Sequence, residues 1–155
     1  MQTPTRRRHF LRTNRYSEPG RIYMVTVVVN DRQPVFKDWP SGRPVVQALR
    51  QTEEEGTARS LCWVVMPDHI HWLMELQRGD LSSAVARFKS RSTLGINRRM
   101  GRSGQFWQKG FHEHALREEE DLQSHSRYIV MNPVRAGLVA SVRQYPLWDA
   151  IWLNS

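Results

Sequence analysis

The chain has 155 residues, of which 39% are hydrophobic, and this length is typical of a single domain. Its one cysteine, Cys62, excludes an intrachain disulfide and a cysteine-rich zinc site. No apolar run approaches the roughly 20 residues of a membrane span, and no apolar signal core follows the basic N-terminus. We therefore expect a soluble intracellular protein. The 23 lysines and arginines exceed the 15 acidic residues and give a formal net charge of +8, and the predominance of arginine favours partners that carry phosphate.

The first half of the chain predicts strands and one helix. Pro44 suits the start of a helix and Gly56 its end, while the β-branched runs on either side are typical of strands. Pro67 and Asp68 form a turn signal, so the segment after them is expected to return as a hairpin partner. The expected elements are a strand at 22–30, a helix at 44–56, a strand at 59–66 and a strand at 69–76.

The second half predicts two longer helices separated by extended chain. Asp80 can cap the first helix, and Pro133 should end the second near residue 132. The tail that follows is expected to pack against the domain through Trp148, Trp152 and Leu153. The expected elements are a helix at 81–100, one or two short strands within 105–116 and a helix at 117–132.

The order of these elements predicts the fold. The sequence β-α-β-β-α-β-(β)-α is that of an α+β, ferredoxin-like (RRM-like) antiparallel sheet with helices on one face, here followed by an additional C-terminal helix. No repeat, low-complexity tract or linker interrupts the chain. We therefore expect a basic N-terminal arm at 1–21 and one domain with its tail at 22–155.

Two histidines in the apolar segment "VVMPDHIHWLMEL" are a candidate metal site. Residues two apart on a strand project to the same face, so His69 and His71 should stand together while Ile70 faces the core. Neutral imidazoles placed side by side are good ligands for a divalent metal. The alternative is two partly exposed histidines with ordinary hydrogen bonds. Asp68 is either a turn residue or a residue that supports a ligand from behind.

The predicted C-terminal helix offers a third ligand and a nucleophile. Tyr128 and Asn132 are four residues apart and should share a helix face. An asparagine oxygen suits Mg²⁺ or Mn²⁺ better than zinc, and a phenol beside such a metal is a candidate nucleophile. The alternatives are a buried aromatic ring for Tyr128 and a helix-terminal residue before proline for Asn132. Tyr145 is the next candidate nucleophile.

A second pair, His112 and His114, flanks a glutamate rather than an apolar residue. Because an acidic middle residue should not tie a strand to a core, this pair is less convincing as a set of metal ligands. We expect no direct functional role for this pair, and the alternatives are that it lines the DNA path or supports the site.

The positive charge is concentrated in two stretches that favour nucleic acid as a partner. No acidic residue lies between Asp80 and Glu113, and the N-terminal arm contains a single glutamate. The alternatives are a solvated surface and a frayed tail. Phe10, Tyr16, Phe106 and Trp107 are candidate stacking partners for bases, although core packing is the stronger expectation for Trp107. The candidate DNA-binding residues are Arg6, Arg7, Arg8, Arg12, Arg15, Arg21, Lys89, Arg91, Arg98, Arg99, Arg102 and Lys109.

Three motifs together resemble one family. "PDHIHWLM", "FWQKGFHEHALR" and "SRYIVMNPVRAGLV" are similar to those of the REP-associated tyrosine transposases, relatives of the single-tyrosine HUH (His-hydrophobic-His) transposases. The resemblance runs from about Tyr16 to Tyr145. It implies that His69 and His71 bind the metal and that Tyr128 is the nucleophile. Asn132 stands where insertion-sequence relatives have a glutamine as third ligand.

The resemblance also implies a reaction and a partner. Its members cut single-stranded DNA at hairpins of repetitive extragenic palindromes, leaving a 5′-phosphotyrosine and a free 3′-hydroxyl, so rejoining needs no ATP. By this resemblance we expect a divalent metal, Mg²⁺ or Mn²⁺, and a nucleoid-associated protein of the bacterial cytoplasm. We expect a monomer, with a dimer as the alternative.

Two other functions remain open at this point. One is a non-catalytic nucleic-acid-binding module, because an RRM-like sheet also serves that purpose. The other is a metal-dependent nuclease that uses water and leaves no covalent adduct. Labelled hairpin DNA with manganese and a denaturing protein gel would separate all three.

Overall fold

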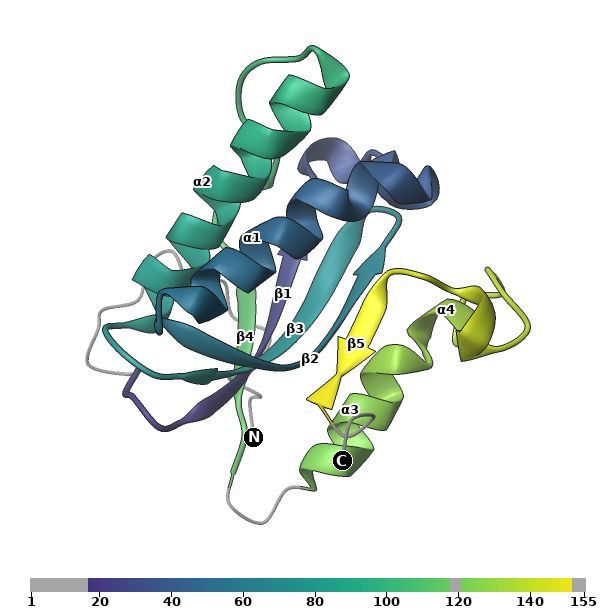
Figure 1. Cartoon of the computed structure of the whole chain (residues 1–155). Coiled ribbons are helices and arrows are strands. Elements are labelled where there is room, and N and C mark those ends of the chain that lie inside the picture. The colour runs from purple at the N-terminus through teal and green to yellow at the C-terminus, as the bar shows by residue number, and fades with distance from the viewer. Residues whose placement is uncertain (1–16, 118–120, 152–155) are drawn as a thin grey trace.

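The computed structural model describes residues 17–117 and 121–151. Five strands form an antiparallel sheet in the order β4-β1-β3-β2-β5 (Figure 1). Their bounds are Ile22–Val28 (β1), Ala58–Met66 (β2), His69–Leu76 (β3), His112–Ala115 (β4) and Trp148–Ala150 (β5). The first four strands have the order of a ferredoxin-like sheet, so the predicted fold class is confirmed.

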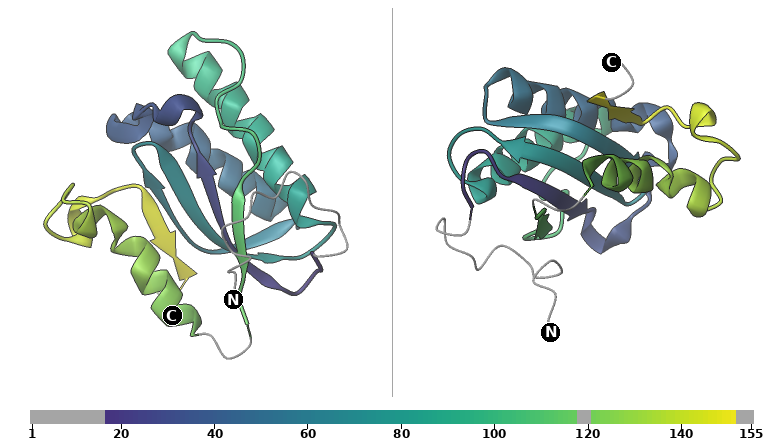
Figure 2. Two further views of the ribbon diagram at one scale, coloured as in Figure 1. Left: turned by 180° about the vertical axis from the view of Figure 1, so that it is seen from behind. Right: turned by 90° about the horizontal axis from the view of Figure 1, so that it is seen from below.

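The helices lie on both sides of this sheet (Figures 1 and 2). Their bounds are Arg43–Glu54 (α1), Leu81–Met100 (α2), Leu122–Val130 (α3) and Asn132–Arg135 (α4). The ring of Trp72 on β3 packs against Phe88 of α2 with centroids 5.3 Å apart. On the opposite face, the Cys62 thiol of β2 lies 3.7 Å from the Ser126 carbonyl of α3, so α1 and α2 cover one face and α3 the other.

The core lies mainly between the sheet and the pair α1–α2. Alternate residues of β3, Ile70, Trp72 and Met74, are fully buried there, as the period of a strand requires. Asp80 caps α2 as predicted, because its carboxylate accepts the backbone N–H of Ser83 at 2.8 Å. Burial on this face leaves the alternate residues on the other face, where His69 and His71 lie.

The C-terminal part differs from the expected elements. Asp121 caps α3, which ends at Val130, and Asn132 begins the separate short helix α4. Trp148 lies in β5, a strand that the sequence pattern does not predict and that pairs with the outer edge of β2. Trp152 and Leu153 lie outside the described residues. None of the helices within 17–117 and 121–151 has the length and apolarity to cross a membrane.

Candidate active site

His69 and His71 project together from β3, as the strand period predicts. Their ring centroids are 4.8 Å apart and the rings stand nearly perpendicular, at 83°. Nδ1 of His69 lies 2.7 Å from the Asp68 carboxylate, and Nδ1 of His71 lies 3.0 Å from the Thr26 hydroxyl on β1. With Nδ1 engaged in both rings, Nε2 is the nitrogen that each ring can offer to a metal.

Asp68 supports His69 and is itself held by Arg32, a residue that was not predicted from the sequence. The guanidinium of Arg32 donates to the second carboxylate oxygen at 3.0 Å. Burial alone would raise the pKa of Asp68, but the hydrogen bonds from His69 and Arg32 outweigh it, and the pKa lies below its usual range. Because the Asp68 carboxylate stays ionised, its hydrogen bond with Nδ1 fixes the orientation of the His69 ring.

The histidine pair fits a divalent metal in part. Two imidazoles held at Nδ1 by oxygen atoms are the usual arrangement for metal-binding histidines. The described residues contain no cluster of three or more histidine, cysteine, aspartate or glutamate side chains that could hold a metal ion. Within the described part of the chain, a complete site needs a ligand of another residue type, and Asn132 is the candidate from the sequence.

Tyr128 is accessible and lies under a cation. Its side chain is 59% exposed on α3, and the guanidinium carbon of Arg135 lies 3.8 Å from the ring centroid. Arg135 also donates to the Tyr128 carbonyl, at 2.5 Å, and to the Asn132 amide oxygen. Arg135 was not predicted as a site residue, although its positions three and seven residues after Asn132 and Tyr128 are helical spacings.

The break between α3 and α4 falls between Tyr128 and Asn132. Met131 keeps near-helical backbone angles, φ −83° and ψ −4°, so the chain turns onward without a sharp change of direction. The expected continuous helix through residue 132 is wrong. Arg135 connects the two residues across the break.

Tyr145, the other candidate nucleophile, is buried at 2% exposure. Its hydroxyl donates to the Val65 carbonyl at 2.5 Å, and burial raises its pKa to about 12. Both properties oppose formation of a phenolate there, which leaves Tyr128 as the better candidate of the two.

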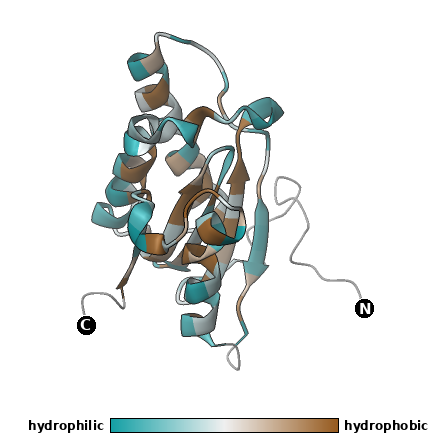
Figure 3. Cartoon of the chain, turned by 90° about the vertical axis from the view of Figure 1, so that its right-hand side faces the viewer, coloured by the Kyte–Doolittle hydropathy of each residue, from teal (hydrophilic) through white to brown (hydrophobic). Residues whose placement is uncertain are grey.

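His112 and His114 lie on the same face of the sheet as the first pair. Thr26 of β1 is directly opposite His71 on one side and His112 on the other, and cross-strand partners point to the same face. Glu113 between them is 6% exposed, so the expectation that an acidic middle residue would not tie this strand to the core is wrong. The ring centroids of His114 and of His125 on α3 are 6.1 Å apart. Figure 3 shows the hydrophilic β4 beside its apolar neighbours.

The candidate DNA-binding residues of the acid-free segment divide into two groups. Lys89 donates to the carbonyls of Gln108 and Gly110, at 2.8 Å and 2.5 Å, and Arg91 pairs with Glu55. Arg102 donates to the side chain of Asn97 at 2.6 Å and lies over the ring of Phe106, 5.2 Å from its centroid. The second group, which faces solvent, consists of Arg98, Arg99 and Lys109.

Other predicted DNA contacts lie elsewhere. Phe106 and Trp107 are 3% and 2% exposed and pack in the core, so the proposed stacking of bases on Phe106 is wrong and the core position of Trp107 is confirmed. The Arg21 guanidinium forms an ion pair with the Glu18 carboxylate, with nitrogen and oxygen 3.5 Å apart. The remaining candidates of the arm, Arg6, Arg7, Arg8, Phe10, Arg12, Arg15 and Tyr16, lie outside the described residues.

A strand-borne histidine pair and an exposed tyrosine on the covering helix lie on one face of this ferredoxin-like sheet. Residues 20–132 match the family described as "Transposase IS200 like", and the chain belongs to this family. Its members are transposases, which act on DNA.

Within that family, the chain is similar to REP-associated tyrosine transposases. A candidate protein of that name from Haemophilus influenzae is 32% identical over 139 residues, which cover 82% of this chain and 78% of the relative. The REP-associated tyrosine transposase of Escherichia coli K12 is 36% identical over 86 residues, which cover 54% of this chain and 49% of the relative.

Two solved structures have the same fold. The structure of a REP-associated tyrosine transposase bound to a REP hairpin matches with a TM-score of 0.70 and 28% identity, covering 88% of this chain and 80% of that one. The crystal structure of a candidate transposase from Deinococcus radiodurans R1 matches with a TM-score of 0.52 and 16% identity, over 74% of this chain and 88% of that one. The second likeness concerns the fold alone.

Proposed function

We propose that this transposase-family protein binds DNA hairpins of repetitive extragenic palindromes and cleaves and rejoins the adjacent single strand through a 5′-phosphotyrosine. The observation that carries the proposal is the pair His69 and His71, each fixed at Nδ1, on the sheet face that also holds the helix of Tyr128. The relative bound to a REP hairpin supports a hairpin as the partner.

His69, His71 and Asn132 would hold the metal, Mg²⁺ or Mn²⁺. When bound, such an ion supplies Lewis-acid polarisation of a phosphate oxygen. Asp68 and Thr26 keep the two imidazoles oriented. The Asn132 amide oxygen accepts a hydrogen bond from Arg135, which orients the amide and leaves the second lone pair of this oxygen for a metal.

Tyr128 carries the covalent step. Its phenolic oxygen attacks the scissile phosphorus and forms a new O–P bond. The bond between phosphorus and the 3′-oxygen of the departing strand breaks, and that oxygen takes up a proton. The phenol proton passes to solvent or to a nearby base. Arg135 places positive charge 3.8 Å from the Tyr128 ring, where negative charge develops. Because the phosphodiester is conserved in the tyrosyl ester, the reverse reaction rejoins DNA without ATP.

Electrostatic attraction brings the DNA to this site. The exposed Arg98, Arg99 and Lys109 follow the hairpin backbone, and the basic arm reaches the single strand at the hairpin foot. We further propose that the protein acts as a monomer near the bacterial nucleoid, with residues 22–155 as its catalytic domain.

A covalent-trapping assay tests this proposal against its alternatives. A 3′-labelled hairpin with a single-stranded flank is incubated with the protein and Mn²⁺ and run on a denaturing protein gel. We expect a labelled protein band. Cleaved DNA without that band would indicate a nuclease that uses water, and binding without cleavage would indicate a nucleic-acid-binding module.

Removing the support behind His69 should weaken metal binding. We expect Asp68→Asn to lower Mn²⁺ affinity, measured by calorimetry, by about 10- to 100-fold because the carboxylate no longer fixes the ring. The matched control is Asp149→Asn, an exposed aspartate on β5 whose carboxylate accepts the backbone N–H of Ala150. Equal affinities for both variants would show that Asp68 acts only in the turn.

Deleting residues 1–15 should weaken hairpin binding and flatten its salt dependence. The log–log slope should decrease by roughly 0.7 for each phosphate of the single strand that the arm neutralises. The catalytic residues lie outside the deletion, so covalent adduct should still form at high protein concentration.

The control is the hairpin without its single-stranded flank. We expect the truncated protein to lose most of its preference for the flanked probe across a salt series. An unchanged slope with an unchanged flank preference would reassign recognition to the Lys89–Lys109 segment.

A further inference from the structure

An exposed tryptophan lies near the end of β2 and takes no part in the site described above. Trp39 begins the short 3-10 turn η6 (Trp39–Gly42), and its side chain is 40% exposed. Its ring meets the ring of Tyr145 edge-on, with centroids 5.8 Å apart. Tyr145 is buried and bonded to the Val65 carbonyl, so Trp39 rests on a rigid support.

Trp39 is one wall of a groove of about 500 Å³ between the start of α1 and residues 146–147, which we call the Trp39 groove. Arg43 and Arg50 line it from α1, and their spacing of seven residues places both on one face, about 10 Å apart along the axis. Of the described residues that line this groove, none is acidic. Within the described chain, neither arginine forms an ion pair.

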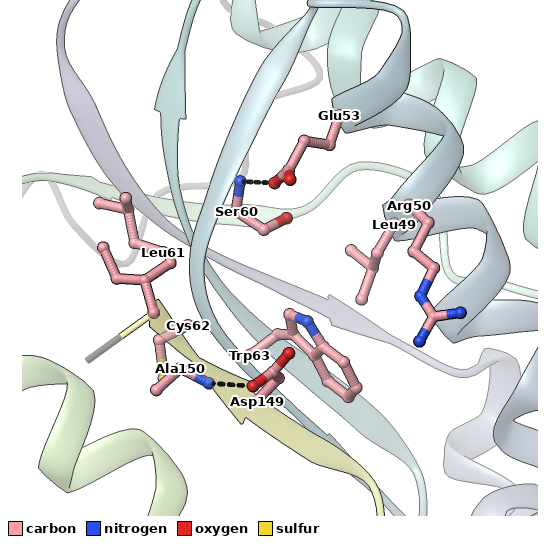
Figure 4. Close-up of a pocket in the computed structure, with 10 residues that line it drawn as sticks. Leu49, Arg50, Glu53, Ser60, Leu61, Cys62, Trp63, Asp149 and Ala150 are labelled. Carbon is pink, nitrogen blue, oxygen red and sulfur yellow. Dashed lines mark hydrogen bonds between the residues drawn. The ribbon is translucent and has the colours of Figure 1, made fainter. Parts of the chain in front are cut away.

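Arg50 also borders a neighbouring pocket of about 260 Å³, which contains two carboxylates (Figure 4). Both carboxylates have local partners. Glu53 accepts the backbone N–H of Ser60 at 2.8 Å, and Asp149 accepts that of Ala150 at 2.8 Å. Among the described residues neither carboxylate forms an ion pair with Arg50, so no salt bridge has to break before this arginine contacts a ligand in the Trp39 groove.

Both walls of the groove are attached to the end of β2 that leads to the histidine pair. The backbone N–H of Phe36, shortly before η6, donates to the Pro67 carbonyl at 3.0 Å. On the other wall, the N–H of Val65 donates to the Leu147 carbonyl at 2.9 Å. Pro67 is two residues from the first histidine of the pair, so the groove and the candidate active site share this end of the sheet, on opposite faces.

We propose that the Trp39 groove binds one nucleotide of the single-stranded DNA beside the hairpin. The base stacks on Trp39, and adjacent phosphates pair with Arg43 and Arg50. Stacking on an indole is favourable for every base, and the guanidinium fork matches phosphate oxygens. An acidic peptide would use the arginines but not the face of the indole. This inference rests on the proposed function, because it requires single-stranded DNA at the site.

Two probes isolate the groove from the rest of the binding surface. One is a blunt DNA hairpin, and the other is the same hairpin extended by eight thymidines, on each side of its foot in turn. All proteins carry Tyr128→Phe so that binding is measured without covalent capture. We expect Trp39→Ala to lower affinity for an extended hairpin about 5- to 100-fold and to leave the blunt hairpin unaffected.

The arginines and a matched control complete the comparison. The double variant Arg43→Gln/Arg50→Gln should bind the same extended probe more weakly and reduce its salt slope by roughly 1.4, which corresponds to two phosphates. Arg59→Gln removes one positive charge from the opposite end of β2 and should change neither probe. Equal decreases on both probes, or no decrease on either, would overturn the proposal.

Three further measurements keep the test independent of folding and of catalysis. Trp39→Phe retains a stacking surface and should keep most of the affinity, and 5-iodouracil in the extension should cross-link the wild type within the tryptic peptide 38–50. Cross-links found only elsewhere would also overturn the proposal. With Tyr128 restored, Trp39→Ala should still form the covalent adduct at saturating DNA. A wild type that forms no adduct refutes the proposed function and leaves the flank comparison valid.

Discussion

A Tyr128→Phe protein should bind hairpin DNA as the wild type does, while its yield of covalent DNA–protein adduct falls by at least about 1,000-fold. Phenylalanine keeps the ring that lies 3.8 Å from the Arg135 guanidinium and removes only the phenolic oxygen. The side chain is 59% exposed, so the substitution leaves the core unchanged. The measurement pairs a gel-shift titration with the denaturing gel of the 3′-labelled probe.

Tyr145→Phe is the matched control for this result. It removes a buried hydroxyl that donates to the Val65 carbonyl, so it should lower the free energy of unfolding by roughly 1 kcal/mol and leave adduct formation intact. If Tyr128→Phe kept full cleavage and Tyr145→Phe lost it, the nucleophile would be Tyr145 despite its burial.

The second large effect is expected at the histidine pair. His69→Ala and His71→Ala should each lower adduct formation by at least about 100-fold, because each removes one of few ligands to an ion worth several kcal/mol of charge stabilisation. EDTA should do the same to the wild type, and added Mn²⁺ should restore activity. Calorimetry with Mn²⁺ should show weaker binding in both variants.

His112→Ala and His114→Ala provide the comparison on the same face of the sheet. Thr26 on β1 is the cross-strand partner of His71 on β3 and also of His112 on β4, so His112 is one strand further from His71 on the same face. We expect milder losses of cleavage and unchanged Mn²⁺ affinity. If the His112 and His114 variants lost activity while the His69 and His71 variants kept it, the metal site would have been assigned to the wrong histidine pair.

The sequence was sufficient to predict those parts of the fold that depend on local periodicity. The turn at Pro67 and the strand period of two place His69 and His71 on one face, and the Asp80 cap sets the start of α2. Strand β5 was not predictable in this way, because its three residues carry too short a pattern and are held by hydrogen bonds to the distant β2. Long-range pairing, not local preference, makes that segment a strand.

The candidate site was predictable to the same degree and for the same reason. The imidazoles follow from spacing within one strand, whereas Arg32 reaches Asp68 from a residue 36 positions earlier. Arg135 contacts the Tyr128 ring across the break between α3 and α4, which the sequence pattern did not predict. Contacts that depend on how a loop or a helix break places residues in space are not visible in the residue pattern of the sequence.

The hydrogen bonds of Lys89 to the carbonyls of Gln108 and Gly110 have a consequence for mutational scans of this protein. Lys89→Ala would release the segment after α2 from the helix, and the resulting loss of DNA binding would resemble that of a residue that binds phosphate. Arg99→Ala, on the exposed end of the same helix, has no such structural cost. A ranking of basic residues by reduced affinity therefore confuses anchoring with recognition unless the melting temperature of each variant is measured beside its affinity.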